Sequence, residues 1–206
     1  MTSHAAPVSR RKAKKDEWRR QIAHAAVTLF EEKSFGATTM DEIAAAADVS
    51  RPTVFNYFAR KEDIPEFFMG WMLEDRVAAR LDGWTALPPQ DALRSCLVAL
   101  ATIFADFRET SRTFHMLRMQ EGRKEFLPPP GHPMHRVMAC LDGWIEAGQA
   151  AGTFRRDFRA REMAPHLCIG LFASTYGLWM LGEYGDAPYP AVLERHFDLL
   201  IGGLSG

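Results

Sequence analysis

Apolar residues recur at helical spacing along most of the chain, and turn-forming residues separate the helical stretches. The first stretch places Trp18, Ile22, Ala26 and Phe30 on one face and ends near Lys33, before a Phe-Gly turn. We find no segment with the strict alternation of apolar and polar residues that marks a half-buried strand. The pattern predicts an all-α protein of about nine helices.

The longer helical patterns lie beyond residue 60, where Pro, Gly and polar residues interrupt them and predict loops. Leu93, Leu97, Leu100 and Phe104 form one apolar stripe, which is typical of a helix packed on one side. We expect helices over residues 61–83, 110–120, 133–151 and 159–183. A further helix carries the stripe just described and follows a linker at 85–89, and the last helix carries Val192 to Leu204.

Residues 38–61 read as two short helices joined by a tight turn over residues 48–50. Thr39 is suited to cap the first helix, and Glu42, three residues later, completes a capping box. The second helix is capped either by Ser50 or by Arg51, with Pro52 at the first helical position. A helix-turn-helix of this kind places its second helix in the major groove of DNA.

The second helix carries side chains that can read base edges. Arg51 can donate two hydrogen bonds to guanine O6 and N7, and Asn56 can pair with adenine. Pro52 offers an apolar contact to a thymine methyl group or to the sugar backbone. The alternative is that Arg51 and Asn56 are ordinary solvated residues. The residues of this helix expected to face the protein core are Val54, Phe55 and Phe58.

The segment resembles the DNA-binding domain of TetR-family transcription regulators over about residues 18–68. Its matches are Thr39, Ile43, Ala44, Val49, Ser50, Thr53, Tyr57, Phe58, Lys61 and Glu62. It departs from the family pattern where Pro52 replaces a glycine, where Phe55 replaces a tyrosine, and where Arg60 stands in place of a capping serine. The resemblance implies that Thr39, Tyr57 and Lys61 hold phosphates. The expected DNA contacts are therefore Thr39, Arg51, Pro52, Thr53, Asn56, Tyr57 and Lys61.

Charge is distributed unevenly along the 206 residues, although the formal net charge is only −1. Residues 1–60 hold ten Lys and Arg against seven Asp and Glu, and the remainder holds 15 against 19. A basic N-terminal module on an acidic body favours a DNA-binding role. We expect a disordered basic tail over residues 1–15, a helix-turn-helix domain over 16–63, and a helical ligand-binding and dimerisation domain over 64–206.

The segment 164–182 contains no Asp, Glu, Lys or Arg. Pro165, His166 and three glycines dilute its hydrophobicity, which favours a doubly buried helix over a membrane span. We expect Leu167, Leu171, Ser174, Leu178 and Leu181 to face the inside of the subunit. In the TetR family the last two helices form the dimer interface, so the resemblance implies a homodimer. The interface residues expected here are Gly170, Ala173, Gly177, Met180, Phe197 and Leu200; the alternative is a fully internal helix.

Large apolar side chains crowd the middle of the chain, and aromatic residues and methionines suit an adaptable apolar pocket. We expect a hydrophobic small-molecule effector, either neutral or cationic. His115 and His166 are the candidates for orienting it, and ordinary core packing is the alternative for each of these residues. The expected ligand contacts are Trp71, Phe104, Phe107, Phe114, Leu117, Trp144, His166, Phe172 and Tyr176.

Other chemistry is less well supported. The cysteines Cys96, Cys140 and Cys168 form no CxxC pair and suit a reduced cytoplasmic core. His132 and His135 near Cys140 lack a third ligand at convincing spacing, so we expect neither a metal nor a cofactor. The sequence thus predicts a dimeric repressor that binds a palindromic operator, is released by a hydrophobic effector and is not an enzyme. The alternatives are a helical enzyme with a vestigial helix-turn-helix and a regulator without a ligand.

Overall fold

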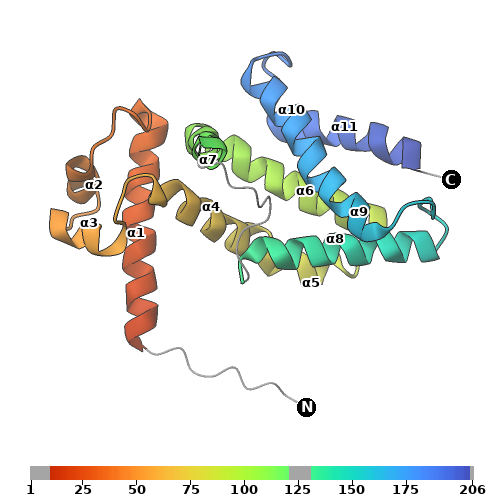
Figure 1. The fold of residues 1–206 in the computed structure, drawn as a ribbon, viewed down its shortest axis with the longest axis horizontal. Helices are drawn as coiled ribbons and strands as arrows, with labels where there is room; N and C mark the ends of the chain where they lie inside the picture. The colour runs from red at the N-terminus through yellow and green to blue at the C-terminus, as the bar shows by residue number, and fades with distance from the viewer. Residues whose placement is uncertain (1–9, 121–130, 205–206) are drawn as a thin grey trace. The chain divides into compact units, whose positions relative to one another are not determined.

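The computed structural model describes residues 10–120 and 131–204, and every regular element in these ranges is helical (Figure 1). This confirms the all-α fold. The chain divides into two compact units. The first unit holds residues up to Met69 together with Phe107–Gly122, and the second holds Gly70–Asp106 and the remainder of the chain. Each unit is described separately below.

The first unit is built around α1 (Arg10–Lys33), which packs against α2 (Met40–Ala46); α2 in turn packs against α3 (Arg51–Tyr57). The start of α4 (Asp63–Arg76) and the whole of α7 (Arg108–Gln120) complete this unit. Figure 1 shows α1 as the long helix beside α2 and α3. The core of this unit includes the fully buried side chains Ile22, Phe30, Ile43, Val54, Ile64 and Phe68.

The N-terminal helix begins earlier than the sequence predicted. We expected residues 1–15 to be disordered, but α1 already starts at Arg10, and residues 1–9 lie outside the described range. Residues 10–15 carry no apolar periodicity, which led to the wrong prediction for them. They are Arg, Lys and Ala, which favour helix by intrinsic propensity, so α1 extends into them without an apolar stripe.

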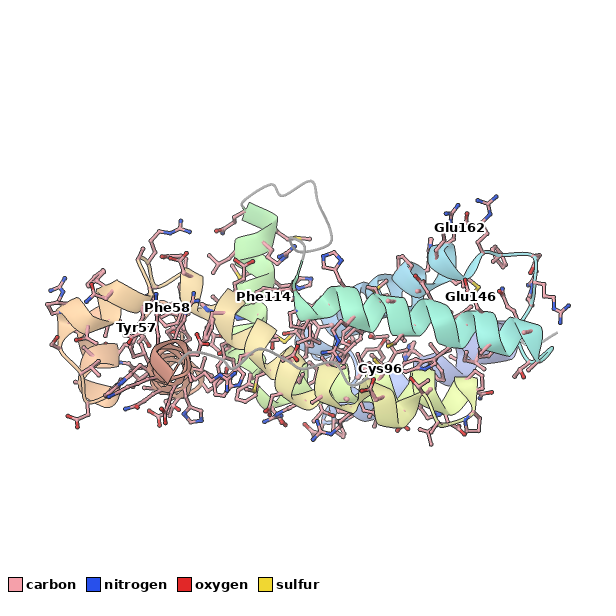
Figure 2. The ribbon with its side chains drawn as sticks, turned by 90° about the horizontal axis from the view of Figure 1, so that it is seen from below. Tyr57, Phe58, Cys96, Phe114, Glu146 and Glu162 are labelled. Atoms are coloured by element: carbon pink, nitrogen blue, oxygen red, sulfur yellow. The ribbon has the colours of Figure 1, made fainter. Side chains whose placement is uncertain are left out.

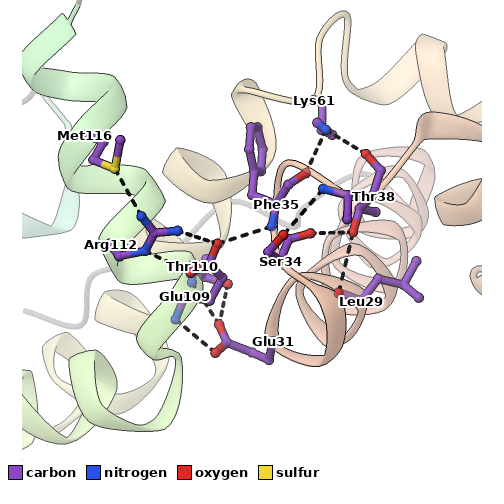
Figure 3. A network of polar contacts seen from close by, with 11 residues as sticks. Leu29, Glu31, Ser34, Phe35, Thr38, Lys61, Glu109, Thr110, Arg112 and Met116 are labelled. Atoms are coloured by element: carbon purple, nitrogen blue, oxygen red, sulfur yellow. Dashed lines mark hydrogen bonds and ion pairs between the residues drawn. The ribbon is translucent and has the colours of Figure 1, made fainter. Parts of the chain in front are cut away.

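Glu31 joins the end of α1 to the start of α7 (Figure 3). Its carboxylate accepts hydrogen bonds from the backbone amides of Glu109 at 3.0 Å and Thr110 at 2.8 Å, and from the Thr110 hydroxyl at 2.7 Å. Glu109 in turn accepts a hydrogen bond from the backbone amide of Phe35, at 3.3 Å. The first amides of a helix have no partner within the helix, so a carboxylate from another helix satisfies them. The sequence-based boundary after residue 63 did not anticipate that α7 belongs with the helix-turn-helix.

Replacing Glu31 by alanine should lower the free energy of unfolding by about 1–3 kcal/mol. The backbone amide and the hydroxyl of the fully buried Thr110 would both lose their hydrogen-bond acceptor. Chemical denaturation measures the loss. Glu32→Ala is the matched control, since this neighbouring carboxylate is exposed. Equal effects of the two substitutions would contradict the capping role of Glu31.

The second unit is a bundle in which α6 (Pro89–Asp106) packs against both α8 (Pro133–Ala150) and α11 (Tyr189–Leu204). Its other elements are η1 (Ala78–Arg80), α5 (Leu81–Trp84), α9 (Ala160–Pro165), the π-helical turn η2 (His166–Gly170) and α10 (Leu171–Met180). Cys96, labelled in Figure 2, is one of the fully buried side chains on α6.

Two predicted helices are interrupted. The helix expected over 61–83 ends at Arg76, because Val77, with φ −117° and ψ −63°, starts a short 3-10 turn. The helix expected over 159–183 contains Pro165, which has no amide proton to donate, and a π-helical turn follows it directly. A π-helical turn holds more residues than an α-helical turn, so it changes which side chains of the following α10 face inward. The loop predicted over 122–133 lies largely outside the described residues.

Candidate nucleic-acid interface

The capping box predicted at the start of α2 is present. The Thr39 amide donates to the Glu42 carboxylate at 2.8 Å, and the Glu42 amide donates to the Thr39 hydroxyl at 3.3 Å. Glu42 also forms an ion pair with Lys33 on α1. Lys33, followed by the amide and hydroxyl of Thr39, lowers the pKa of the Glu42 carboxyl to about 2. The first helix of the motif is therefore fixed both within itself and to α1.

The turn between α2 and α3 settles which residue caps α3. Asp48 adopts the left-handed conformation, with φ 53°, and the Val49 amide donates to the Ala44 carbonyl at 3.0 Å. The Ser50 hydroxyl accepts from the Thr53 amide at 3.3 Å. Ser50 is thus the N-cap, and Arg51 and Pro52 occupy the first helical positions.

Helix α3 buries one narrow stripe and leaves the rest of its surface open. Val54 is fully buried and Phe58, the C-cap, is 1% exposed. Phe55 is 42% exposed, so its predicted core position is wrong. The physical reason is the helical period, since residue 55 lies about 100° around the helix from Val54, whereas residue 58 returns to the same side. Of the predicted DNA contacts, Thr39, Arg51, Pro52 and Asn56 are exposed, and Thr53 and Tyr57 are half-buried.

Lys61, the remaining predicted phosphate contact, is bound to the protein itself. Its ammonium donates to the backbone carbonyls of Phe35 at 2.7 Å and Thr38 at 2.6 Å, and lies 4.4 Å from the centre of the Phe35 ring. Figure 3 shows these bonds closing the turn between α1 and α2. In this structure Lys61 therefore stabilises the domain, and its contact with phosphate stays a prediction.

Arg19 is a residue of the first unit that the sequence did not single out. Its guanidinium lies 4.2 Å from the centre of the Phe67 ring and 5.1 Å from that of Phe58. Figure 2 labels Phe58 beside Tyr57 at the end of α3. Cation–π contacts of this kind link α1 to the end of α3 and the start of α4. The one signal in the sequence is that this basic residue directly follows Trp18, the first residue of the apolar stripe of α1.

The residues expected to bind the effector fall in both units. Phe107, Phe114 and Leu117 belong to the first unit, and Trp71, Phe104, Trp144, His166, Phe172 and Tyr176 belong to the second. In the second unit, the centre of the Phe104 ring lies 5.2 Å from that of Phe172 and 5.1 Å from that of Tyr176. Tyr176 also makes an edge-to-face contact with Tyr189, with ring centres 5.4 Å apart. The structure brings these rings into one aromatic cluster, which we call the α6–α10 aromatic cluster.

Trp144 and His166 occupy different surroundings from that cluster. Trp144 is 5% exposed, and its indole N–H donates to the Thr85 hydroxyl at 3.3 Å. His166 is exposed, and its Nδ1 lies 2.6 Å from the Glu162 carbonyl oxygen. Trp71 is half-buried. A hollow of about 490 Å³ lies elsewhere, on the first unit, and is lined by α1 and α2 residues that include Ala25, Leu29 and Ala46.

The predicted dimer residues divide into an exposed and a buried group. Gly170 and Gly177 are exposed, Met180 is half-buried and Leu200 is 42% exposed, whereas the Ala173 side chain lies outside the described residues. Phe197 is fully buried inside the subunit, so its predicted place at the interface is wrong. It faces α6, where the Arg94 guanidinium lies 5.1 Å from its ring centre.

The inward stripe predicted for this region is also partly wrong. Leu167 and Leu171 are buried as expected, but Ser174, Leu178 and Leu181 are exposed, and Thr175 and Tyr176 take the buried positions. The exposed side, which we call the α10–α11 face, combines small residues with leucines. It consists of Gly170, Ser174, Gly177, Leu178, Leu181, Leu199 and Leu200.

Three further findings concern the other chemistry considered for the sequence. Burial raises the pKa of the Cys96 thiol and raises that of Cys168 to about 12, which keeps both protonated and unreactive. Among the described residues, no cluster of three His, Cys, Asp or Glu is arranged to hold a metal ion. None of the helices described is long and apolar enough to cross a membrane.

Comparison with known proteins places the helix-turn-helix of the first unit in one family. Residues 22–66 match the family model described as bacterial regulatory proteins of the tetR family. The chain is 28% identical to MftR, a transcriptional regulator of Mycobacterium tuberculosis, with 89% of each chain covered. It is 24% identical to the HTH-type transcriptional repressor BepR of Brucella suis, covering 94% of this chain and 90% of that protein.

Among solved structures, the chain is similar to Thermus thermophilus FadR, a TetR-family transcriptional repressor in complex with lauroyl-CoA. The two are 25% identical with a TM-score of 0.53, and the match covers 90% of this chain and 94% of the other. The family model covers the helix-turn-helix, and the similar regulators extend the likeness over nine-tenths of the chain. The chain thus carries the DNA-binding domain of the TetR family, and over nine-tenths of its length it is similar to transcription regulators.

Proposed function

We propose that this regulator is a homodimeric repressor, which binds a two-fold symmetric operator through α3 and leaves it when a hydrophobic effector binds. The observation that carries the proposal is the geometry of α3. Its caps and buried stripe hold a seven-residue helix whose exposed side carries Arg51 and Asn56. These side chains have the donors and acceptors that read guanine and adenine in the major groove.

The repressor assignment is supported by the named relatives. BepR and Thermus thermophilus FadR are both called repressors. A regulator of bacterial genes works where the chromosome is, so we place this protein in the cytoplasm. The DNA-binding residues proposed are those expected from the sequence, with Arg51 and Asn56 reading bases and Thr39, Tyr57 and Lys61 holding phosphates.

The effector proposed is a molecule with a long apolar part. The α6–α10 aromatic cluster supplies polarizable apolar surface in the second unit, and half-buried Phe104 lies at its edge. The lauroyl-CoA bound to Thermus thermophilus FadR combines an acyl chain with a charged head. We therefore rank acyl-CoA first among the hydrophobic compounds to be tested, although the sequence alone favoured a neutral or cationic molecule.

Genome-wide mapping of bound DNA tests the DNA-binding part of the proposal. Wild-type protein should occupy a small set of sites that share a sequence, and Arg51→Ala should weaken binding to a mapped site by about 1–3 kcal/mol and relax base preference locally. Arg161→Ala is the matched control, because Arg161 is an exposed arginine on α9. The proposal fails if Arg51→Ala and Arg161→Ala bind the mapped site as tightly as wild type.

Titration of the operator complex tests the effector. Long-chain acyl-CoA or another hydrophobic compound should release DNA and raise the melting temperature by mass action. Phe104→Ala should reduce this response while leaving DNA affinity without ligand nearly unchanged. Phe104 is a better probe than buried Trp144, whose removal would destabilise the unit. Release by sugar phosphates and simple acids alone would contradict the proposed effector, and no release by any compound would favour a regulator without a ligand.

A further inference from the structure

Arg51, the first residue of α3, is held by a carboxylate from α2. Asp41, in the first turn of α2, lies with its Oδ1 3.2 Å from Nε of Arg51. Its Oδ2 accepts a hydrogen bond from Nη1 of the same guanidinium, also at 3.2 Å. The carboxylate is therefore hydrogen-bonded to Nη1 and also lies close to Nε.

The opposite edge of the Arg51 guanidinium is left for another acceptor pair. A guanidinium carries five N–H groups in a flat fork, and Asp41 accepts from one of them, on Nη1. The hydrogen bond to Asp41 does not use the two N–H groups of Nη2. Guanine presents N7 and O6 side by side in the major groove, which matches such an edge. Arg51 can thus bind Asp41 and guanine at the same time.

An aromatic ring limits the motion of the same guanidinium. Phe55 lies one helical turn after Arg51, and its ring centre is 5.6 Å from Cζ of Arg51. Phe55 is 42% exposed, so its ring lies on the open side of α3 together with Arg51. The ring and the carboxylate together restrict the rotamers of an arginine that would otherwise move freely in solvent.

A carboxylate in the first turn of α2 favours that helix by itself, and this effect does not require the pairing with Arg51. The side chains of Arg51 and Asp41 are 62% and 63% exposed, and exposed ion pairs of this kind contribute little to folding. A negative charge close to the expected path of the DNA also opposes binding to phosphates of any sequence. The arrangement therefore lowers general DNA affinity and has its effect on the orientation of Arg51.

We propose that Asp41 is a positioning residue that sets the base specificity of Arg51, by accepting from Nη1 so that the N–H groups of Nη2 are aimed at guanine. The proposal rests on the proposed function, in which α3 reads an operator. Asp41 is not among the DNA contacts expected from the sequence. The proposal makes it a determinant of the base pair that Arg51 selects.

The test uses full-length protein and operators selected from random duplexes. The base pair read by Arg51 is the one at which Arg51→Ala loses preference. At that pair, the operator with guanine is compared with operators carrying adenine or 7-deazaguanine, which lacks the N7 acceptor. Asp41→Asn should reduce the preference for guanine by about tenfold while binding unrelated DNA as tightly as wild type or tighter. In an Arg51→Ala background, Asp41→Asn should leave base preference unchanged.

Asp48→Asn is the matched control, since it neutralises another exposed carboxylate of the same motif. Asparagine also tolerates the left-handed backbone of residue 48. This variant should keep the full preference for guanine, and melting temperatures should show that both variants remain folded.

Three results with the Asp41 and Asp48 variants would overturn the inference. Asp41→Asn could retain the wild-type preference, both Asn variants could lose it equally, or the lost preference could be for a neighbouring cytosine that Asp41 reads directly. A wild-type protein that selects no sequence would instead overturn the proposed function, and the inference with it. Arg51→Ala with unchanged base preference would overturn the inference while leaving the regulator itself intact.

Discussion

Replacing Gly177 by arginine should give monomers in place of the proposed dimer and lower affinity for a two-half-site operator by about 10²–10⁴-fold, because both half-sites must be bound together. Gly177 lies on the α10–α11 face, where four leucines are exposed to between 42% and 77%. A Cβ atom at this position meets no other atom within 4 Å, so the subunit itself accommodates the side chain. At an interface of about 2,000 Å² or more, an arginine brings an unpaired charge into contact with the partner.

The matched control is Gly143→Arg on α8. Gly143 is also an exposed helical glycine with nothing within 4 Å of an added Cβ. Sedimentation equilibrium at micromolar concentration should show a dimer for wild type and Gly143→Arg, and a monomer for Gly177→Arg. A monodisperse wild-type monomer, or a dimeric Gly177→Arg, would contradict the placement of the interface.

Replacing Phe197 by alanine should lower the free energy of unfolding by about 3–5 kcal/mol, because its ring is fully buried against α6. This loss is a large fraction of the about 5–15 kcal/mol that stabilises a typical domain. Denaturation at several protein concentrations separates a loss of core packing from a loss of dimer contacts, since only the latter depends on concentration.

Leu200→Ala provides the comparison on the same helix. Leu200 is 42% exposed on the α10–α11 face, so its truncation should have little effect on the subunit and should weaken dimerisation instead. If Phe197→Ala weakened dimerisation without destabilising the subunit, the sequence-based assignment of Phe197 to the interface would be correct and its core position wrong.

The parts of the fold that the sequence predicted well depend on neighbouring residues. The capping box of Thr39 and Glu42 and the turn before α3 involve contacts over three to five positions, so a local pattern specifies them. The exposure of Phe55 was missed because the seven positions of α3 contain three apolar residues. The buried side of the helix holds only one of them, Val54.

The parts that could not be predicted depend on distant residues or on the phase of a helix. Glu31 caps α7 across 79 positions of sequence, and nothing local to either helix indicates this pairing. The π-helical turn after Pro165 rotates the inward side of α10, which put Leu178 and Leu181 on the wrong face in the prediction. The pairing of Asp41 with Arg51 likewise required the spatial arrangement of α2 and α3.

The most direct test of the central claim is selection of random-sequence duplexes by the purified wild-type protein at physiological salt. A dimer that reads DNA through α3 should enrich a roughly palindromic sequence whose half-sites lie about 34–36 Å apart, or a multiple of that distance. Equal binding of all duplexes, with no sequence enriched over the starting pool, would contradict the assignment of this protein as a sequence-specific regulator.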